Sequence, residues 1–169
     1  MLELRIIIYS FIFLTCSAIG LIKSQKYIYR VEELKEFKNA LNMFKTKIKF
    51  THEPIPEIFD QIAKTITPTI GGIFRIASYN MGFFTAAEAW SKAIDTDILN
   101  INMEDRTILK DLSKLLGATD LEGQLSQIEI TYNFLDEQIV KAEKEKVKNE
   151  AMYRKLGVII GLGIVVVLL

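Results

Sequence analysis

The sequence predicts an all-α protein: a six-helix cytoplasmic bundle flanked by N- and C-terminal transmembrane helices. The first observation is that the 169-residue chain begins and ends with apolar runs, residues 6–22 and 156–169, that carry no charged side chain. The second is that apolar residues between these runs recur at intervals of three and four, without the alternation of a strand. We therefore expect three parts: an N-terminal anchor over 1–23, a helical domain over 24–155 and a C-terminal anchor over 156–169.

The C-terminal run predicts a membrane helix. At about 1.5 Å per residue it would span roughly 21 Å, which is less than the roughly 30 Å of hydrocarbon in a bilayer. The residues just before the run can lengthen the membrane-spanning helix. Tyr153 suits the headgroup level, and Arg154 and Lys155 can extend their charged ends toward it. The alternative is the buried last helix of a soluble core. A helix that is apolar on every face needs protein all around it, and the remaining chain is short for that.

The N-terminal run predicts a second anchor. A cleaved signal peptide is the alternative, because small residues near Cys16 faintly resemble a lipoprotein cleavage site. The anchor is favoured, since the run continues beyond Cys16 and exceeds the usual 7–15-residue apolar core of a signal peptide. Basic residues follow this run and precede the C-terminal one, whereas only Arg5 lies on the far side. The middle of the chain is therefore expected in the cytoplasm, with both termini pointing outward.

The first helix is expected to run over about residues 4–50, out of the membrane without a break. An apolar stripe marks its buried side: Tyr27, Val31, Leu34, Phe37, Leu41, Phe44 and Ile48. A turn around His52 ends it, because Pro54 and Pro56 disfavour helix in the residue before each of them. Pro56 suits the first turn of a second helix, which should stop before Pro68. The buried side of this second helix is expected to comprise Ile55, Ile58, Phe59 and Ile62.

Two short helices should follow. The third is expected over residues 70–79 and should end in a turn at 80–82. Thr85 and Glu88 then have the spacing of a capping box, in which a hydroxyl and a carboxylate satisfy free backbone N–H groups at a helix start. This box predicts a fourth helix, which carries Trp90 and Ile94 on its apolar side.

The fifth helix should begin near Asn102 or Asp105 and stop at Gly117, a residue suited to a left-handed helix end. Its apolar residues are Ile108, Leu109, Leu112, Leu115 and Leu116. Asp120 is expected to cap the sixth helix. Its apolar residues follow a heptad spacing throughout: Leu121, Leu125, Ile128, Tyr132, Leu135, Ile139 and Ala142.

The composition argues against several kinds of chemistry. Because 21 basic residues balance 21 acidic ones, no net positive field favours nucleic acid. His52 is the only histidine and Cys16 the only cysteine, which excludes two-histidine and thiol metal sites. Asp95-Thr96-Asp97 is not followed by the further ligands of a calcium loop. We expect no metal, no cofactor, no catalytic residues and no nucleic acid, and hence a protein that is not an enzyme.

The turn from Gly117 to Gln124 is the candidate partner-binding surface. It combines a helix stop, the Asp120 cap and a new helix N-terminus, so several backbone donors should meet there and favour an anionic group of a partner. Trp90, the only tryptophan, is assigned to the same surface. The alternative roles are structural: Trp90 would fill the core and Asp120 would serve only as a cap.

Gly157 and Gly161 are the candidate packing site of the membrane helices. Four residues apart, they lie on one helical face and would let a second helix approach closely. The partner could be the N-terminal run of the same chain, where Gly20 and other small residues occur. Glycines are also common in membrane helices without such a role.

A set of short motifs spread over essentially the whole chain resembles one known family. They are the N-terminal anchor, Ala40-Leu41, Pro54-Ile55-Pro56-Glu57, Ala89-Trp90, Leu116-Gly117-Ala118-Thr119-Asp120 with Gln124, and Lys155-Leu156-Gly157 before the apolar tail. In this order they resemble stage III sporulation protein AB. That family has a cytoplasmic helical domain similar to the F platform proteins of type II secretion and type IV pilus systems.

The resemblance implies a role in endospore formation, in the mother-cell membrane around the forespore. It implies a non-enzymatic platform subunit of a secretion-like channel complex, whose sister subunits include a secretion-type ATPase. Membrane lipid is a further expected partner, and an oligomeric state is compatible with this role. The alternative function is a two-anchor helical membrane adaptor or sensor unrelated to secretion. Neighbouring genes would separate the two, since a gene for an ATPase beside it favours the platform.

Overall fold

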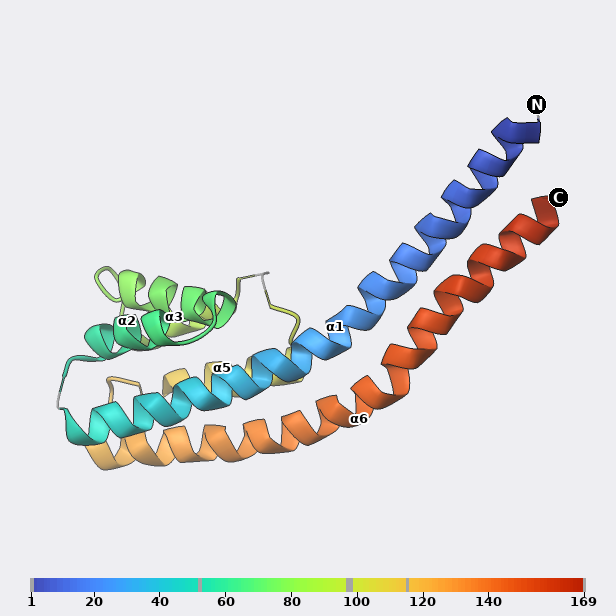
Figure 1. Ribbon diagram of the computed structural model, residues 1–169. Helices are drawn as coiled ribbons and strands as arrows, with labels where there is room; N and C mark the ends of the chain where they lie inside the picture. Colours follow the sequence, from blue (N-terminus) through green and yellow to red (C-terminus); the bar gives the residue numbers. More distant parts are fainter. Residues whose placement is uncertain (1, 52, 97–98, 115, 169) are drawn as a thin grey trace. The chain divides into compact units, whose positions relative to one another are not determined.

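The computed structural model describes residues 2–51, 53–96, 99–114 and 116–168. Regular structure within these ranges is entirely helical, which confirms the predicted all-α class (Figure 1). Six α-helices and one short 3₁₀ helix occur in this order: α1 (Leu2–Phe50), α2 (Ile55–Thr65), α3 (Pro68–Asn80), α4 (Ala86–Ile94), α5 (Met103–Asp111), η1 (Leu112–Lys114) and α6 (Leu121–Leu168).

The chain forms two compact units, and each of the long helices, α1 and α6, contributes a segment to both. The terminal unit comprises Met1–Val31 with Lys141–Leu169, and the central unit comprises Glu32–Val140. These limits follow contacts within the fold, whereas the predicted anchor boundaries at residues 23 and 156 follow hydropathy and remain predictions. Two helices of the described chain, α1 and α6, contain segments long and apolar enough to cross a membrane.

The helix limits in the central unit follow local sequence signals. Pro54 is the N-cap of α2 and Pro56 lies in its first turn, as expected, and Pro68 begins α3. The predicted capping box at α4 is present: the Thr85 hydroxyl accepts from the Glu88 N–H at 3.3 Å, and the Glu88 carboxylate accepts from the Thr85 N–H at 3.1 Å. His52, expected to be a turn residue, and Asp97 lie outside the described residues.

The fifth helix begins as predicted but ends earlier. Asn102 and Asp105 form a second capping box, with hydrogen bonds of 2.8 and 2.9 Å between each side chain and the other's N–H. The α-helix ends at Asp111 and continues only as the 3₁₀ turn η1, instead of running to Leu116. Tightening to 3₁₀ geometry is a common way to satisfy the last carbonyl groups of a helix. Leu115 lies outside the described residues.

The core of the central unit is an aromatic cluster shared by four helices. Phe59 of α2 lies at its centre, with ring centroids 5.1 Å from Phe44 of α1, 5.0 Å from Phe74 of α3 and 5.5 Å from Trp90 of α4. These edge and tilted arrangements are the favoured geometries of aromatic pairs. Six of the seven residues of the predicted α1 stripe are buried, and Tyr27 is half-buried. The predicted periodicity therefore identifies the buried side of α1.

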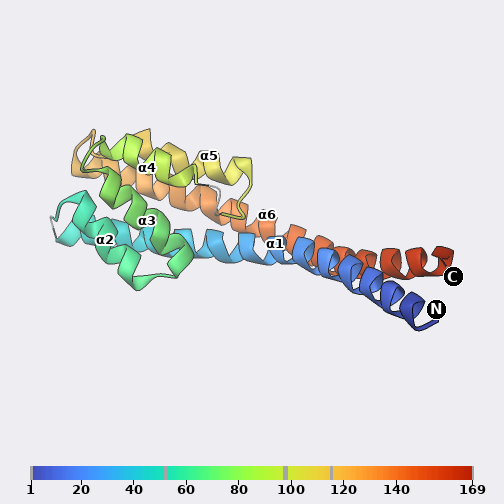
Figure 2. The same cartoon turned by 90° about the horizontal axis from the view of Figure 1, so that it is seen from above.

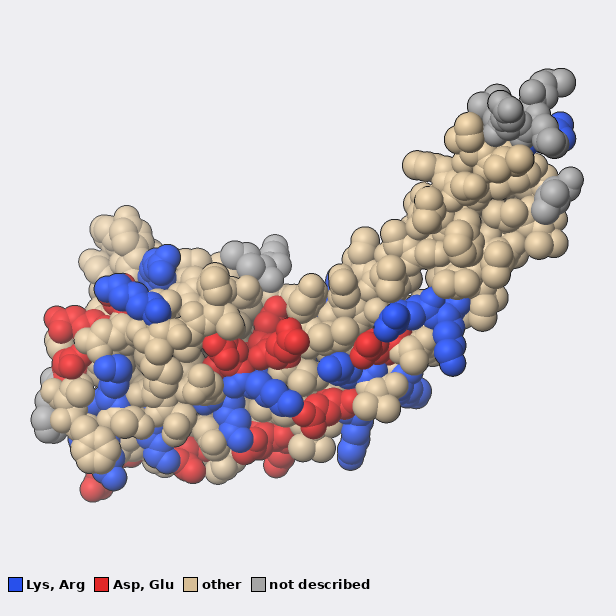
Figure 3. Space-filling view, in the orientation of Figure 1, with Lys and Arg blue, Asp and Glu red and all other residues tan. Residues whose placement is uncertain are grey.

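In the central unit α1 and α6 lie side by side, in agreement between the two views (Figures 1 and 2). Ion pairs join them between Lys38 and Asp136 and between Lys45 and Glu129. The Lys38 ammonium also lies 4.5 Å from the centroid of the Tyr132 ring. Acidic and basic side chains interleave over the face of the central unit seen in Figure 3. Neither sign forms a separate patch on this face.

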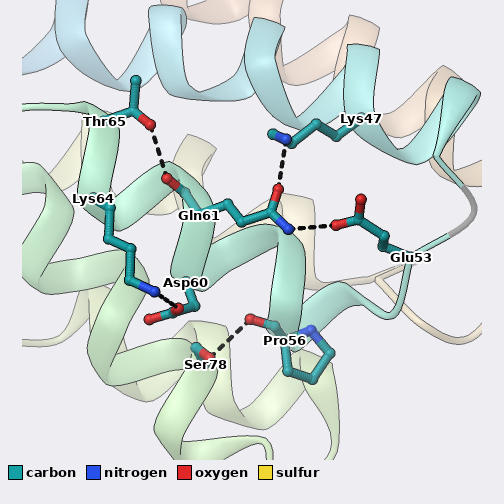
Figure 4. Close-up of polar contacts among 8 residues, drawn as sticks. All are labelled: Lys47, Glu53, Pro56, Asp60, Gln61, Lys64, Thr65 and Ser78. Carbon is teal, nitrogen blue, oxygen red and sulfur yellow. Dashed lines mark hydrogen bonds and ion pairs between the residues drawn. The ribbon is translucent and has the colours of Figure 1, made fainter.

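A polar network fixes α2 against the end of α1 and the loop that follows it (Figure 4). The Gln61 side chain accepts a hydrogen bond from Lys47 Nζ at 2.5 Å and donates one to the Glu53 carboxylate at 2.6 Å. On another side of α2 the Ser78 hydroxyl of α3 donates to the Pro56 carbonyl at 2.9 Å. The amide of Gln61 can both accept and donate, and this lets one side chain join the cation and the carboxylate.

Candidate interaction sites

Trp90 does not belong to a partner-binding surface, which corrects the sequence-based assignment. Its side chain is fully buried in the aromatic cluster, and its indole N–H donates to the Leu109 carbonyl at 2.7 Å. Both the apolar ring and the polar N–H are therefore satisfied inside the protein. The alternative role as core residue is the one that the fold supports.

The turn from Gly117 to Gln124 starts a helix as expected, but Gly117 does not stop one, because η1 already ends at Lys114. Gly117 has a φ of 72°, a left-handed conformation that glycine adopts without strain within the turn. The Asp120 carboxylate accepts from the N–H of Gly123 at 2.9 Å, as an N-cap should. The Gln124 side chain donates to the Thr119 carbonyl at 3.0 Å.

These contacts weaken the reason for placing an anionic partner group at this turn. The Asp120 carboxylate already supplies negative charge to the start of α6, and a second anion would be repelled by it. Gly117 and Asp120 are exposed and Gln124 is half-buried, so contact with a partner remains a prediction for these three residues. In the fold, Gly117 forms part of the turn, and Asp120 and Gln124 act at the start of α6.

A cluster of exposed aromatic side chains, absent from the sequence-based candidates, lies at the end of α3 and in the turn that leads to α4. Tyr79 and Phe83 are 71% and 70% exposed, and their ring centroids lie 5.6 Å apart. Phe84 is 40% exposed, and the ammonium of Lys92 lies 3.5 Å from its ring centroid. We call these four residues the aromatic turn. The sequence signal was two adjacent phenylalanines between Gly82 and the capping box, outside the apolar stripe of either helix.

Large apolar groups at a loop tip are unusual for a surface that meets only water. A soluble face seldom gathers aromatic rings, whereas protein interfaces are enriched in them. Lys92 is held over Phe84 by a cation–π contact, an attraction that strengthens when water is excluded. The aromatic turn thus has the composition of a docking surface.

In the terminal unit the two apolar segments pack through their glycines. Gly20, Gly157 and Gly161 are all buried against the facing helix. A Cβ atom on Gly20 would lie 2.7 Å from the Tyr153 carbonyl oxygen, and one on Gly157 would lie 2.9 Å from the Cys16 carbonyl oxygen. The structure thus brings both predicted packing residues, Gly157 and Gly161, against the N-terminal segment of the same chain.

Polar and aromatic contacts continue this helix pair beyond its apolar part. The rings of Tyr27 and Tyr153 stack at a centroid distance of 5.7 Å. Farther from the apolar part, Arg30 donates to the Glu145 carboxylate at 2.7 Å. At the opposite end the Tyr9 hydroxyl donates to the Leu168 carbonyl at 2.7 Å. The pair is therefore held from end to end, and the charged contact lies on the side predicted to face the cytoplasm.

A buried carboxylate joins α1 to the loop before α5 in the central unit. Glu33 is only 7% exposed and accepts hydrogen bonds of 2.7 Å from both the backbone N–H and the side-chain amide of Asn100. Burial raises the pKa of Glu33 above its usual value, and the two hydrogen bonds from Asn100 oppose this rise without cancelling it. Sequence reasoning did not find this contact, because its partners lie far apart in the chain.

Among the residues that the structure describes, no group of three His, Cys, Asp or Glu side chains is placed to hold a metal ion. A groove of about 410 Å³ in the central unit lies between α1 and α6. It is lined by Lys35, Lys38, Asn39, Asn42, Tyr132, Asp136 and Ile139. Lys38 and Asp136 form an ion pair across this groove, so two of its charged groups are engaged with each other.

Comparison with known proteins assigns the chain to a family. A family model described as stage III sporulation protein AB matches residues 5–169. The stage III sporulation protein AB of Bacillus subtilis (strain 168) is 25% identical over 163 residues, which cover 94% of this chain and 95% of that protein. A solved structure of a stage III sporulation protein AB shares the fold with a TM-score of 0.66 and 22% identity, over 71% of this chain and 98% of that chain. The chain therefore belongs to the stage III sporulation protein AB family.

Proposed function

We propose that this protein is a non-enzymatic membrane platform subunit of a sporulation-specific, secretion-like channel complex. In this proposal the terminal unit anchors the chain in the mother-cell membrane around the forespore. The central unit lies in the cytoplasm and docks a secretion-type ATPase, which supplies the energy. Family membership supports the sporulation role, and the resemblance of the family to secretion platform proteins supports the rest.

The observation that carries the proposal is the pairing of two apolar helix segments within one unit of the chain. Both segments that could cross a membrane belong to one unit, where Gly20 and Gly157 bring them together. The helices that leave this unit are the same two that form part of the central unit, α1 and α6. A chain built in this way presents one folded domain on one side of a membrane.

Topology is the first test. Protease added to intact protoplasts should leave residues 23–155 uncut, because basic residues near both apolar runs favour a cytoplasmic location. Cleavage within that range from outside would contradict the two-anchor arrangement. A mature protein that begins at Cys16 or later would also contradict it.

The aromatic turn is the proposed docking surface for the ATPase. Its rings are exposed, they contact one another, and a cation beside them suits a partner surface that carries both apolar and acidic groups. Replacing Phe83 and Phe84 together by serine should therefore weaken docking by at least tenfold. Because Phe83 is 70% exposed, its replacement should leave the fold largely intact.

Phe50 offers a matched control. It is also 70% exposed but lies at the end of α1, outside the aromatic turn. Co-purification of the full-length chain with a secretion-type ATPase of the same organism should be lost when Phe83→Ser and Phe84→Ser are combined and retained with Phe50→Ser. Equal loss in both variants would indicate nonspecific apolar adhesion. Binding that survives all three changes would remove the aromatic turn from the proposal.

A further inference from the structure

A groove on one side of the terminal helix pair combines cations with an apolar floor. Its volume is about 430 Å³, and it is lined by Ser17, Leu21, Arg154, Lys155, Val158 and Ile159. All six residues lie within the terminal unit. This volume is in the range of sites that bind small molecules.

The charges of the groove lie at one end of it. Val158 and Ile159 follow Arg154 and Lys155 by four residues on α6, which is roughly 6 Å along a helix axis. The cations therefore lie at the predicted cytoplasmic border of the membrane, and the apolar residues lie deeper. The nearest carboxylate to Arg154 is that of Glu150, with 3.8 Å between Nη1 and Oε1. That distance is too long for a hydrogen bond, so the guanidinium keeps donors for a ligand.

Ser17 adds a polar atom within the apolar part. Its hydroxyl is buried and has no hydrogen-bond partner among the residues that the structure describes. A hydroxyl placed among apolar side chains is costly unless it finds an acceptor. Because this hydroxyl is enclosed, it offers no donor to a molecule in the groove, and polar recognition there falls to Arg154 and Lys155.

We propose that this groove binds one anionic phospholipid of the cytoplasmic leaflet. The phosphate group contacts Arg154 and Lys155, and one acyl chain lies along Leu21, Val158 and Ile159. Basic pockets between membrane helices on the cytoplasmic side are suited to such headgroups. This inference rests on the proposed membrane anchoring of the terminal unit.

The opposite side of the helix pair supplies a matched control. A second groove of about 240 Å³ is lined there by Lys23 together with Gly20, Tyr153, Gly157 and other residues. Lys23→Gln removes one positive charge near the same membrane border, and Lys155→Gln removes one from the proposed site. A lipid held only by general attraction to basic residues would respond equally to both changes. A lipid seated in the proposed groove responds only to Lys155→Gln.

The experiment uses the full-length chain in nanodiscs that contain phosphatidylglycerol and phosphatidylcholine, followed by native mass spectrometry after gentle release. We expect one phosphatidylglycerol molecule to remain bound to the wild-type chain. Lys155→Gln should lower this retention by about fivefold, since a lysine near the membrane surface contributes about 1 kcal/mol. Lys23→Gln should leave it unchanged. Val158→Trp, which fills the groove, should abolish it, whereas Gly163→Trp should not, because nothing lies within 4 Å of a Cβ at Gly163.

Several results would overturn the inference. Phosphatidylglycerol and phosphatidylcholine could be retained equally, or Lys23→Gln and Lys155→Gln could lower phosphatidylglycerol retention equally. Inorganic phosphate alone could displace the lipid, or a second copy of the chain could occupy the groove and exclude it. Incorporation into nanodiscs is scored first and separately. A chain that does not incorporate contradicts the membrane anchoring itself. A chain that incorporates but shows no selective lipid contradicts only the lipid site.

Discussion

Gly20 and Gly157 contact each other through their backbones: a Cβ on Gly20 would lie 2.9 Å from the Gly157 Cα, and a Cβ on Gly157 would lie 3.0 Å from the Gly20 Cα. Real Cβ atoms do not approach other atoms so closely, and the obstacle is backbone that cannot rotate away. Close approach of this kind lets dispersion forces and backbone contacts hold two membrane helices together, where lipid competes with any ordinary apolar contact.

This packing predicts a disulfide within one chain. A Cβ at Gly161 would lie 3.2 Å from the Cβ of Cys16, close to the 3.5–4.5 Å separation that disulfides need. Gly161→Cys should therefore form an intramolecular disulfide with Cys16 under mild oxidation of membranes. The check is loss of maleimide labelling at both thiols in the monomeric band. Gly163→Cys is the control and should remain labelled, since a Cβ at Gly163 meets no atom within 4 Å.

The same assay tests the glycine contact itself. Adding Gly157→Leu to Gly161→Cys should abolish the disulfide, because the leucine side chain forces the two helices apart. Adding Gly163→Leu should leave disulfide formation unchanged. Cross-links found only between chains would show that the helices pair between two copies instead.

Adjacent glycines in α3 should respond to alanine in opposite directions. A Cβ on Gly71 would lie 2.6 Å from the Ala63 carbonyl oxygen of α2, whereas a Cβ on Gly72 would meet nothing within 4 Å. Gly71→Ala should lower the free energy of unfolding by about 1–3 kcal/mol, the usual cost of overpacking. Gly72→Ala should raise it by about 1 kcal/mol, since alanine favours a helix interior more than glycine. Denaturant unfolding of the full-length chain, followed by circular dichroism, measures both changes, and equal effects would contradict the α2–α3 contact.

Two glutamates should give opposite pH dependences. Burial raises the pKa of Glu33, so the folded state holds a proton that the unfolded state releases above about pH 4.5. The stability contributed by Glu33 is complete below its unfolded pKa and is lost as the pH rises through the folded one. Hydrogen bonds from the Thr85 backbone and hydroxyl lower the pKa of Glu88. The stability contributed by Glu88 is present above its unfolded pKa and is lost as the pH falls.

The measurement is the melting temperature of the wild type, Glu33→Gln and Glu88→Gln from pH 3.5 to 7. The advantage of the wild type over Glu33→Gln should shrink as the pH rises above about 4.5. Its advantage over Glu88→Gln should shrink as the pH falls below that value. A wild-type advantage over Glu33→Gln that grows with pH would mean that the Asn100 hydrogen bonds outweigh burial.

Local signals in the sequence were sufficient for the helices and for much of their buried sides. Pro54 and Pro56, the capping box at Thr85 and the heptad of the last helix act within a few residues, so their effects can be worked out without a fold. The end of α5 was placed too late, because apolar spacing does not distinguish α from 3₁₀ geometry over one turn. Contacts between distant residues, such as Glu33 with Asn100, could not be predicted, since each partner alone resembles a solvated polar residue.

The wrong assignment of Trp90 to a surface has a related cause. Its rarity in the sequence suggested a special role, but rarity does not distinguish a core residue from a contact residue. The exposed rings of Tyr79 and Phe83 were overlooked because phenylalanine and tyrosine are common in this chain. Which aromatic residue faces outward depends on how α3 and α4 pack, and that arrangement involves residues from four helices.

The position of Trp90 gives this protein a built-in optical probe of one unit. As the only tryptophan, it is the source of all indole fluorescence, and its buried ring lies between Phe59 and Phe74. Its emission should therefore be blue-shifted while the central unit is folded and should move to longer wavelength when that unit opens. The terminal unit contains tyrosines but no tryptophan. Excitation of the purified chain at the red edge of the absorption band thus reports on the central unit alone, even when the terminal unit is embedded in lipid.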